Sequence, residues 1–216
     1  MNFDEAARTW DGEERRVVRA KAVAERLGPI LEPYRGKEAL DFGCGTGLLS
    51  FFLRDNFARI DMLDPSEGMI EVLRGKIAAD DERRRAAGSA PGAIMRPELG
   101  TLDSMAGRLG PYDAIFSMLV LHHIQDTEGT LRCLRSVLGA GGRLTLVDLD
   151  TEDGSYHLEY DDFSGYNGFD RGALSDLAVG AGFARPSFET IYVERRNRGE
   201  GWREYPLFVM AASAAE

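Results

Sequence analysis

The feature that most constrains the fold of this chain is a short run in which every second residue is glycine. It follows directly after a short apolar segment. The segment is Glu38–Phe42, and the glycines are Gly43, Gly45 and Gly47. Glycine adopts positive φ without strain and lets the backbone approach another group where a Cβ atom would intrude. A strand that passes through such a turn into a helix directs helix N-terminal amides at one point, which favours binding of a carboxylate or ribose oxygen. A plain strand-to-helix turn is the alternative interpretation.

The rest of the chain alternates short apolar runs with helical patterns, as is typical of α/β proteins with a doubly wound sheet. A first helix is expected from Asp11, with Glu14 completing a capping box, to the Gly28-Pro29 pair. After this helix, the first five strands are expected at residues 38–42, 58–63, 93–100, 112–120 and 143–148. The helices between and after them are expected at residues 46–56, 66–79, 126–138 and 170–180, with 80–92 forming a helix end and a loop. Because proline cannot donate to a ladder, Pro97 predicts that the third strand lies near a sheet edge.

Two further strands are expected at residues 187–194 and 205–212, joined by the polar turn 195–201. This connection is too short for a parallel crossover, so one of the two strands should run antiparallel to its neighbours. We therefore predict a single domain over residues 36–216, preceded by an N-terminal helical lid or cap segment over residues 1–35.

The composition indicates which partners are not expected. Of the 216 residues, 36 are acidic and 26 basic, which gives a formal net charge of −10. Proteins that bind nucleic acid through its phosphates usually present a basic field, so nucleic acid is not expected as a partner. The short clusters Arg83–Arg85 and Arg195-Arg196 are expected in solvated connections. No apolar run approaches the roughly 18 residues of a membrane span, so no membrane association is expected.

The first residues and the cysteine content indicate the cellular location. The first residues include acids and no apolar segment, so no secretory signal is expected. Two cysteines, Cys44 and Cys133, are too few for a disulfide framework, and nothing indicates an oxidising compartment. The chain is expected in the cytoplasm.

The glycine run does not match the dinucleotide pattern G-x-G-x-x-G, because the sixth position is Leu48 when counted from Gly43 and Ser50 when counted from Gly45. The pattern Asp41-x-Gly43-x-Gly45-x-Gly47 instead resembles the first motif of the class I S-adenosylmethionine-dependent methyltransferases. The likeness extends from about residue 36 to the C-terminus. It implies a seven-stranded, mostly parallel sheet in the order 3-2-1-4-5-7-6, with a C-terminal antiparallel hairpin.

The resemblance implies a site for S-adenosylmethionine, with S-adenosylhomocysteine as the product. The cofactor-binding residues that it implies are Asp41, Gly43, Cys44, Gly45, Gly47, Asp64, Pro65, Met69, Leu102, Asp103, Ser104, Ser117 and Met118. In the family, the acid at the position of Asp64 takes the two ribose hydroxyls, and the acid at the position of Asp103 accepts from the adenine amino group. Asp41 would lie near the ammonium group of the cofactor. A helix cap at Asp64 and a simple turn at Asp103 are the alternatives.

No catalytic residue follows from the resemblance, because the sulfonium is already a strong electrophile and the enzyme works mainly by aligning the acceptor with it. Candidates for a general base are His123 and His122, after the fourth strand, and Tyr156 and His157, in the aromatic and acidic stretch 156–166. Loop histidines bonded to backbone groups, and a stretch that merely covers the surface, are the alternatives. Adjacent histidines are expected to point in different directions and no Cys/His spacing supports zinc, so no metal is expected.

The N-terminal residues 3–10 resemble the mobile lid of small-molecule methyltransferases, with Trp10 closing over the site; a fixed amphipathic helix packed on the sheet is the alternative. The predicted function is methyl transfer to an oxygen, nitrogen or carbon atom of a small or medium-sized acceptor. A non-catalytic S-adenosylmethionine-binding or regulatory module and a protein methyltransferase remain open. The sequence indicates neither the acceptor nor the oligomeric state.

Overall fold

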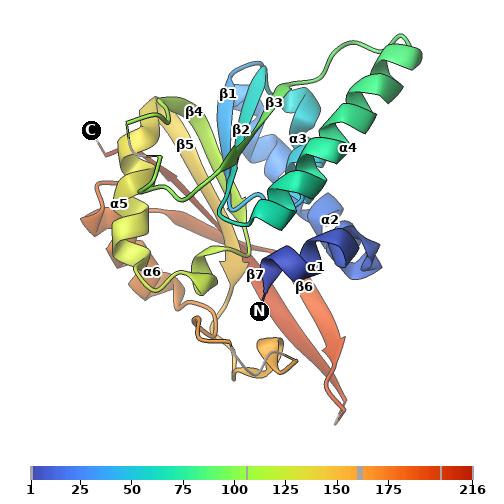
Figure 1. The fold of residues 1–216 in the computed structure, drawn as a ribbon. Helices are drawn as coiled ribbons and strands as arrows, with labels where there is room; N and C mark the ends of the chain where they lie inside the picture. Colours follow the sequence, from blue (N-terminus) through green and yellow to red (C-terminus); the bar gives the residue numbers. More distant parts are fainter. Residues whose placement is uncertain (1, 106, 160–162, 200, 216) are drawn as a thin grey trace. The chain divides into compact units, whose positions relative to one another are not determined.

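The computed structural model describes residues 2–105, 107–159, 163–199 and 201–215 (Figure 1). The chain divides into two compact units, one over Asn2–Met105 and one from residue 106 to the C-terminus. The strand order is β3-β2-β1-β4-β5-β7-β6, which confirms the predicted order. The order also confirms that the strand with Pro97 is an edge strand.

The unit Asn2–Met105 contains three parallel strands. These are β1 (Glu38–Phe42), β2 (Arg59–Asp64) and β3 (Ile94–Leu99), with β2 between the other two. Its helices are α1 (Phe3–Ala6), α2 (Glu14–Leu31), α3 (Leu48–Leu53) and α4 (Glu67–Ala86), with 3-10 turns η1 (Ala7–Gly12), η2 (Glu32–Tyr34) and η3 (Arg54–Asn56). β1 and β2 are buried along nearly their whole length, as their continuous apolar runs predict for a sheet covered on both faces, whereas the edge strand β3 has a single buried residue.

The first helix and the helix after β2 differ from the predictions. The first long helix begins at Glu14 rather than Asp11, because Asp11 accepts hydrogen bonds from a distant segment and does not cap it. It also continues through Pro29 to Leu31. The helix α4 runs to Ala86, so the helix end predicted within residues 80–92 includes Arg83–Arg85, which do not lie in a connection as expected. Arg84 pairs with Asp80 one turn earlier at 3.0 Å, and this pair supports the added turns.

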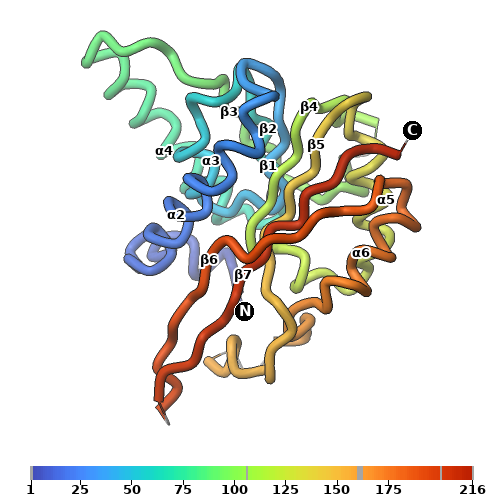
Figure 2. The backbone as a smooth tube through the Cα atoms, turned by 180° about the vertical axis from the view of Figure 1, so that it is seen from behind, coloured from blue at the N-terminus to red at the C-terminus, as the bar shows by residue number. Residues whose placement is uncertain are grey.

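The unit from residue 106 contains β4 (Tyr112–Met118), β5 (Leu138–Leu149), β6 (Ser187–Asn197) and β7 (Trp202–Ser213). Its helices are α5 (Thr127–Val137) and α6 (Arg171–Gly180), with 3-10 turns η4 (Leu121–His123) and η5 (Ser155–His157). β4 and β5 are parallel, whereas β7 runs antiparallel to both β5 and β6. Figure 2 shows β6 and β7 side by side as a long hairpin, which confirms the predicted antiparallel pair.

The hairpin strands are longer than predicted. β6 continues to Asn197, so Arg195 and Arg196 lie in a strand rather than in a connection. Arg196 stays there because its guanidinium lies 3.6 Å from the centre of the Tyr156 ring and pairs with Glu194 at 2.7 Å. β5 likewise begins at Leu138 instead of residue 143. Among the described residues, the helices are all too short or too polar to cross a membrane.

Candidate functional site

Asp64, the last residue of β2, connects the loops that follow β1 and β2. One carboxylate oxygen accepts from the Gly45 N–H at 2.8 Å, and the other accepts from the Ser66 N–H at 2.9 Å. Ser66 caps α4, because its Oγ accepts from the Met69 N–H at 3.2 Å. Asp64 is therefore not the helix cap. Burial is the main cause that raises the pKa of Asp64, and each of its oxygens keeps lone-pair capacity for a further donor.

The glycines of the first loop have different physical roles. Gly45 and Gly47 have φ of 54° and 79°, in the left-handed region. A Cβ atom on Gly47 would come within 2.7 Å of Leu73 Cδ1 and Met62 Cε, so packing inside the protein requires glycine there. The nearest atom to a Cβ on Gly45 is Met69 Sδ at 3.9 Å. The space beside Gly45 is thus one that a side chain would fill and that a bound molecule can use.

The other residues of the loop are tied to the end of β2. The N–H groups of Gly43 and Cys44 both donate to the Leu63 carbonyl, at 2.8 and 3.1 Å. Burial raises the pKa of the Cys44 thiol well above its usual value, so Cys44 is a neutral thiol at pH 7. Cys44 therefore contributes packing and backbone groups rather than a nucleophile.

Asp41 lies inside the unit, just before the glycine loop, with 2% of its surface exposed. Its Oδ2 accepts from Ser50 Oγ at 2.6 Å. Burial raises the pKa of Asp41 to about 7; the Ser50 hydrogen bond opposes this shift and the charge of Asp64 adds to it. A carboxyl group with this pKa gains or loses its proton near neutral pH, according to the charge placed beside it.

The N-terminal segment is bonded to both loops by two acids, Asp4 and Asp11, that the sequence analysis did not assign to the site. Asp4 Oδ1 accepts from Ser66 Oγ at 2.6 Å and from the Gly68 N–H at 2.9 Å. Asp11 accepts from Thr46 Oγ1 and from Lys76 Nζ, each at 2.5 Å. These contacts place residues 2–12 against the loops of the candidate cofactor site. Whether the segment opens as a lid remains a prediction.

The residues predicted to contact adenine follow β3. Leu102 is buried, whereas Asp103 and Ser104 are exposed. Ser104 Oγ accepts from the Thr101 N–H at 2.8 Å, so Ser104 stabilises the local turn. Pro65 is exposed at the start of the next loop, and Met69 is buried in the first turn of α4. All the predicted cofactor residues up to Ser104 thus lie in one unit, at or near the carboxyl ends of its strands.

Ser117 and Met118, the last predicted cofactor residues, end β4 in the other unit. Ser117 is buried, and Leu119 directly after Met118 has a φ of 59°. Positive φ is strained for a residue with a side chain, and such residues are often found at functional sites. Leu119 was not predicted, because nothing in its residue type signals this conformation.

Of the four candidates for a general base, the three histidines lie together after β4 and in η5. His122 and His123 have ring centres 4.1 Å apart, and His122 and His157 have ring centres 5.0 Å apart. The expectation that the adjacent histidines point in different directions is therefore wrong. His122 Nδ1 lies 2.6 Å from Asp148 Oδ1, and both side chains are 1% exposed. His122 is thus bonded to a buried carboxylate at the end of β5 and not to backbone groups.

The fourth candidate and the aromatic stretch surround these histidines. Tyr156 is buried and donates its hydroxyl hydrogen to Glu194 at 3.0 Å, so this hydroxyl supports the segment. Phe163 stacks on His157 with ring centres 3.8 Å apart and an angle of 9° between the planes. The Tyr166 N–H donates to the His122 carbonyl at 2.7 Å. The described residues of the stretch therefore pack on the histidines, and Tyr160 lies outside the described residues.

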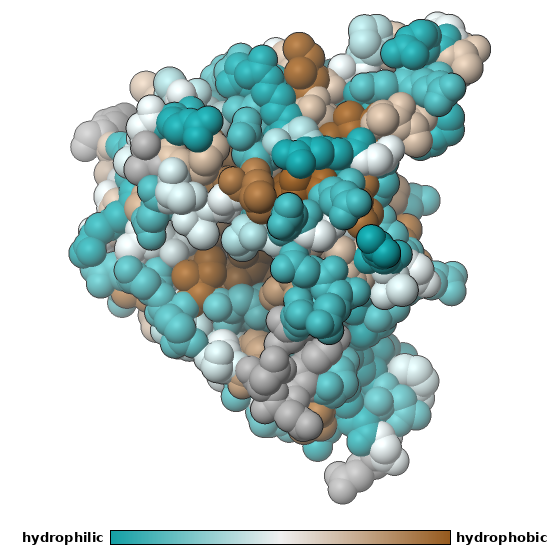
Figure 3. Space-filling view, in the orientation of Figure 1, coloured by the Kyte–Doolittle hydropathy of each residue, from teal (hydrophilic) through white to brown (hydrophobic). Residues whose placement is uncertain are grey.

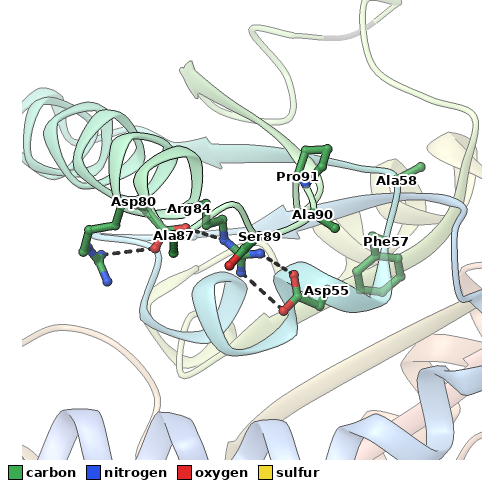
Figure 4. Close-up of a pocket in the computed structure, with 11 residues that line it drawn as sticks. Asp55, Phe57, Ala58, Asp80, Arg84, Ala87, Ser89, Ala90 and Pro91 are labelled. Atoms are coloured by element: carbon green, nitrogen blue, oxygen red, sulfur yellow. Dashed lines mark hydrogen bonds and ion pairs between the residues drawn. The ribbon is translucent and has the colours of Figure 1, made fainter.

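A pocket with a volume of about 760 Å³ lies elsewhere (Figure 4). It is lined by residues next to the start of β2, the end of α4 and the start of β3, so it lies at the opposite end of the strands from Asp64. Arg84 points toward Asp55 in the figure and pairs with it at 2.9 Å. The predicted cofactor residues take no part in this pocket.

Comparisons with known proteins agree with this arrangement. Residues 40–144 match the family model described as a methyltransferase domain. A ubiquinone biosynthesis O-methyltransferase of Methylocella silvestris is 32% identical over 126 residues, which cover 58% of this chain and 44% of the relative. A tRNA U34 carboxymethyltransferase of Vibrio cholerae is 32% identical over 132 residues, covering 59% of this chain and 37% of the relative. The chain thus spans less than half the length of these two relatives.

The fold is also found in solved structures. Burkholderia thailandensis 1,6-didemethyltoxoflavin-N1-methyltransferase, solved with 1,6-didemethyltoxoflavin and S-adenosylhomocysteine, superposes with a TM-score of 0.65 at 20% identity. The superposition covers 100% of this chain and 84% of that one. At this identity the likeness concerns the fold.

Proposed function

We propose that the chain is a class I S-adenosylmethionine-dependent methyltransferase, which transfers a methyl group to an oxygen, nitrogen or carbon atom of a small or medium-sized acceptor. The observation that carries the cofactor part of this proposal is the open space beside Gly45, next to the carboxylate of Asp64. Protein atoms fill the corresponding space at Gly47, whereas the space at Gly45 is open and lies where the Gly45 N–H meets the Asp64 carboxylate.

The residues present fit the cofactor in three respects. Asp64 can accept from ribose hydroxyls while it holds both loops, Gly45 leaves room for a close approach, and Asp41 can supply a negative charge for an ammonium group. When bound, S-adenosylmethionine supplies a methyl group on a positively charged sulfur. The N-terminal segment, held by Asp4 and Asp11, would exclude water from this side of the site.

A small acceptor is supported by the charge of the protein. The net charge of −10 repels a phosphate backbone, and hydrophilic residues cover most of the face shown in Figure 3. The Methylocella silvestris relative is named for ubiquinone biosynthesis and the Vibrio cholerae relative for tRNA, so both acceptor classes belong in the test. The aromatic stretch with Tyr156, Phe163 and Tyr166 would supply apolar walls for a small acceptor. A cytoplasmic location is part of the proposal.

The acceptor class is tested by incubating the protein with methyl-labelled S-adenosylmethionine and panels of phenols, nitrogen heterocycles, tRNA and protein. We expect label to appear in a small molecule, with release of S-adenosylhomocysteine. The Asp64→Ala variant, purified in the same way, controls for contaminating activity and should be far less active. Label found only in tRNA or only in protein would contradict the small-acceptor proposal, and a protein that binds the cofactor without any turnover would favour the non-catalytic module.

Binding of the cofactor should depend on pH through Asp41. Because the pKa of Asp41 in the folded protein, about 7, exceeds its ordinary value, the free protein loses stability as the pH rises from about 4 through 7. A positively charged ligand group favours the ionised carboxylate, so affinity for S-adenosylhomocysteine should rise over the same range and a proton should be released on binding at pH 6. Calorimetry in two buffers with different ionisation enthalpies measures that proton. Asp41→Asn should remove the proton release, and an unchanged release would contradict this role.

A further inference from the structure

The chain has three histidines, and all three lie in one cluster. Each of His122, His123 and His157 offers one ring nitrogen, and these three nitrogens lie within 4.8 Å of one another. His122 and His123 are held by η4 after β4, whereas His157 comes from η5 after β5. Two separate segments of the same unit thus bring three imidazole nitrogens close together.

Asp148 fixes the orientation of His122. Because a carboxylate accepts hydrogen bonds, Nδ1 of His122 donates to Asp148 Oδ1 at 2.6 Å, which leaves Nε2 as the ring nitrogen that can bind a metal ion. Nε2 is buried and has no hydrogen-bond partner among the described residues. A carboxylate that accepts from one nitrogen of a histidine while the other nitrogen is unbound is the usual second shell of a metal-ligating histidine.

The other two histidines lie against His122. The ring centre of His123 lies 4.1 Å from that of His122, and the ring centre of His157 lies 5.0 Å from that of His122 and 5.5 Å from that of His123. A neutral imidazole binds a metal ion through the lone pair of one ring nitrogen.

From this geometry we propose that His122, His123 and His157 bind one divalent metal ion of the zinc class, with Asp148 as the positioning residue of His122. Zinc bound to imidazole at about 2.0–2.1 Å places ligand nitrogens roughly 3.3 Å apart, so the three rings would have to approach one another on binding the ion. Three imidazoles suit zinc, cobalt, nickel or copper rather than magnesium or calcium. Three protein ligands leave a fourth position for water or for an anionic oxygen or sulfur ligand.

Cobalt(II) is the direct probe, because tetrahedral cobalt absorbs visible light whereas zinc does not. The protein is prepared without a histidine tag, treated with a chelator and titrated with cobalt, then with zinc. We expect one equivalent of cobalt to give visible bands that zinc removes. In a proton NMR spectrum, zinc should shift the ring signals of all three histidines. Because the chain has three histidines, all in this cluster, histidine ring signals report on this site alone.

Substitutions then test the assignment. His123→Gln and His157→Gln should each weaken cobalt binding at least tenfold, and Asp148→Asn should weaken it about 10–100-fold, as loss of a second-shell partner does. Asp176→Asn, at an exposed carboxylate on α6 of the same unit, and Cys133→Ser should bind as the wild type does. Circular dichroism establishes that each variant is folded, and His123→Gln changes the least buried of the three histidines.

Two results would overturn the proposal. One is a folded wild-type protein that shows no visible bands and no histidine shifts with a tenfold excess of cobalt or zinc. The other is cobalt binding that remains unchanged in His123→Gln, His157→Gln and Asp148→Asn. These measurements do not involve methyl transfer, so they test metal binding independently of the proposed function.

Discussion

Replacing Gly45 with valine should weaken binding of S-adenosylhomocysteine by at least about 100-fold, or roughly 2.8 kcal/mol, while the protein still folds. The new side chain would occupy the space that lies open beside Gly45, where the nearest protein atom to a Cβ is 3.9 Å away. The backbone there has a φ of 54°, so the substitution also adds backbone strain, which costs about 1–2 kcal/mol of stability. Calorimetry with the folded variant measures the loss of affinity.

Two other glycines separate this effect from strain and from packing. Gly36 has a φ of 72° and no atom within 4 Å of a Cβ position, so Gly36→Ala should lower stability by about 1 kcal/mol and leave cofactor affinity unchanged. Gly47→Ala should instead destabilise the fold, because its Cβ would lie 2.7 Å from two buried side chains. Normal cofactor binding by Gly45→Val would refute the assignment of the space to a ligand.

Asp64→Ala should lower cofactor affinity by about 10–100-fold, because it removes the acceptor for buried hydroxyl groups, a loss worth roughly 1–3 kcal/mol. It should also lower the free energy of unfolding, since Asp64 accepts from two backbone N–H groups that would lose their partner. Calorimetry for affinity and thermal unfolding for stability measure the two effects.

The matched control is Asp61→Asn, on the same strand. Asp61 is also nearly buried, at 9% exposed, and pairs with Arg59 at 3.2 Å. This substitution should reduce stability without changing the cofactor affinity. If Asp64→Ala reduces stability but leaves the affinity for the cofactor unchanged, Asp64 only stabilises the two loops. The cofactor site must then be assigned to other residues.

The sequence predicted the strands and the first loop because these depend on local features. A continuous apolar run identifies a buried strand, and glycine at alternate positions identifies a turn with positive φ, as found at Gly43, Gly45 and Gly47. The strand order came from the family resemblance, since apolar periodicity does not specify which strands are neighbours. The N-terminal lid or cap segment, residues 1–35, and the domain that follows it remain predictions.

What the sequence did not predict depends on pairs of residues far apart in the chain. Asp4 and Ser66 are separated by 62 positions, Asp11 and Lys76 by 65, and His122 and Asp148 by 26. Asp11 was interpreted as a helix cap, which is the commonest local role of that residue type before a helix. Asp148 had one available signal, because it lies near the carboxyl end of its strand, where doubly wound sheets bind ligands.

The measurement that tests the central claim most directly is calorimetric titration of the purified protein with S-adenosylhomocysteine and, separately, with NAD. A class I methyltransferase site should bind S-adenosylhomocysteine at least about tenfold more tightly, a difference of about 1.4 kcal/mol. Equal binding, or a preference for NAD, would contradict the assignment of the glycine loop and of Asp64 to S-adenosylmethionine.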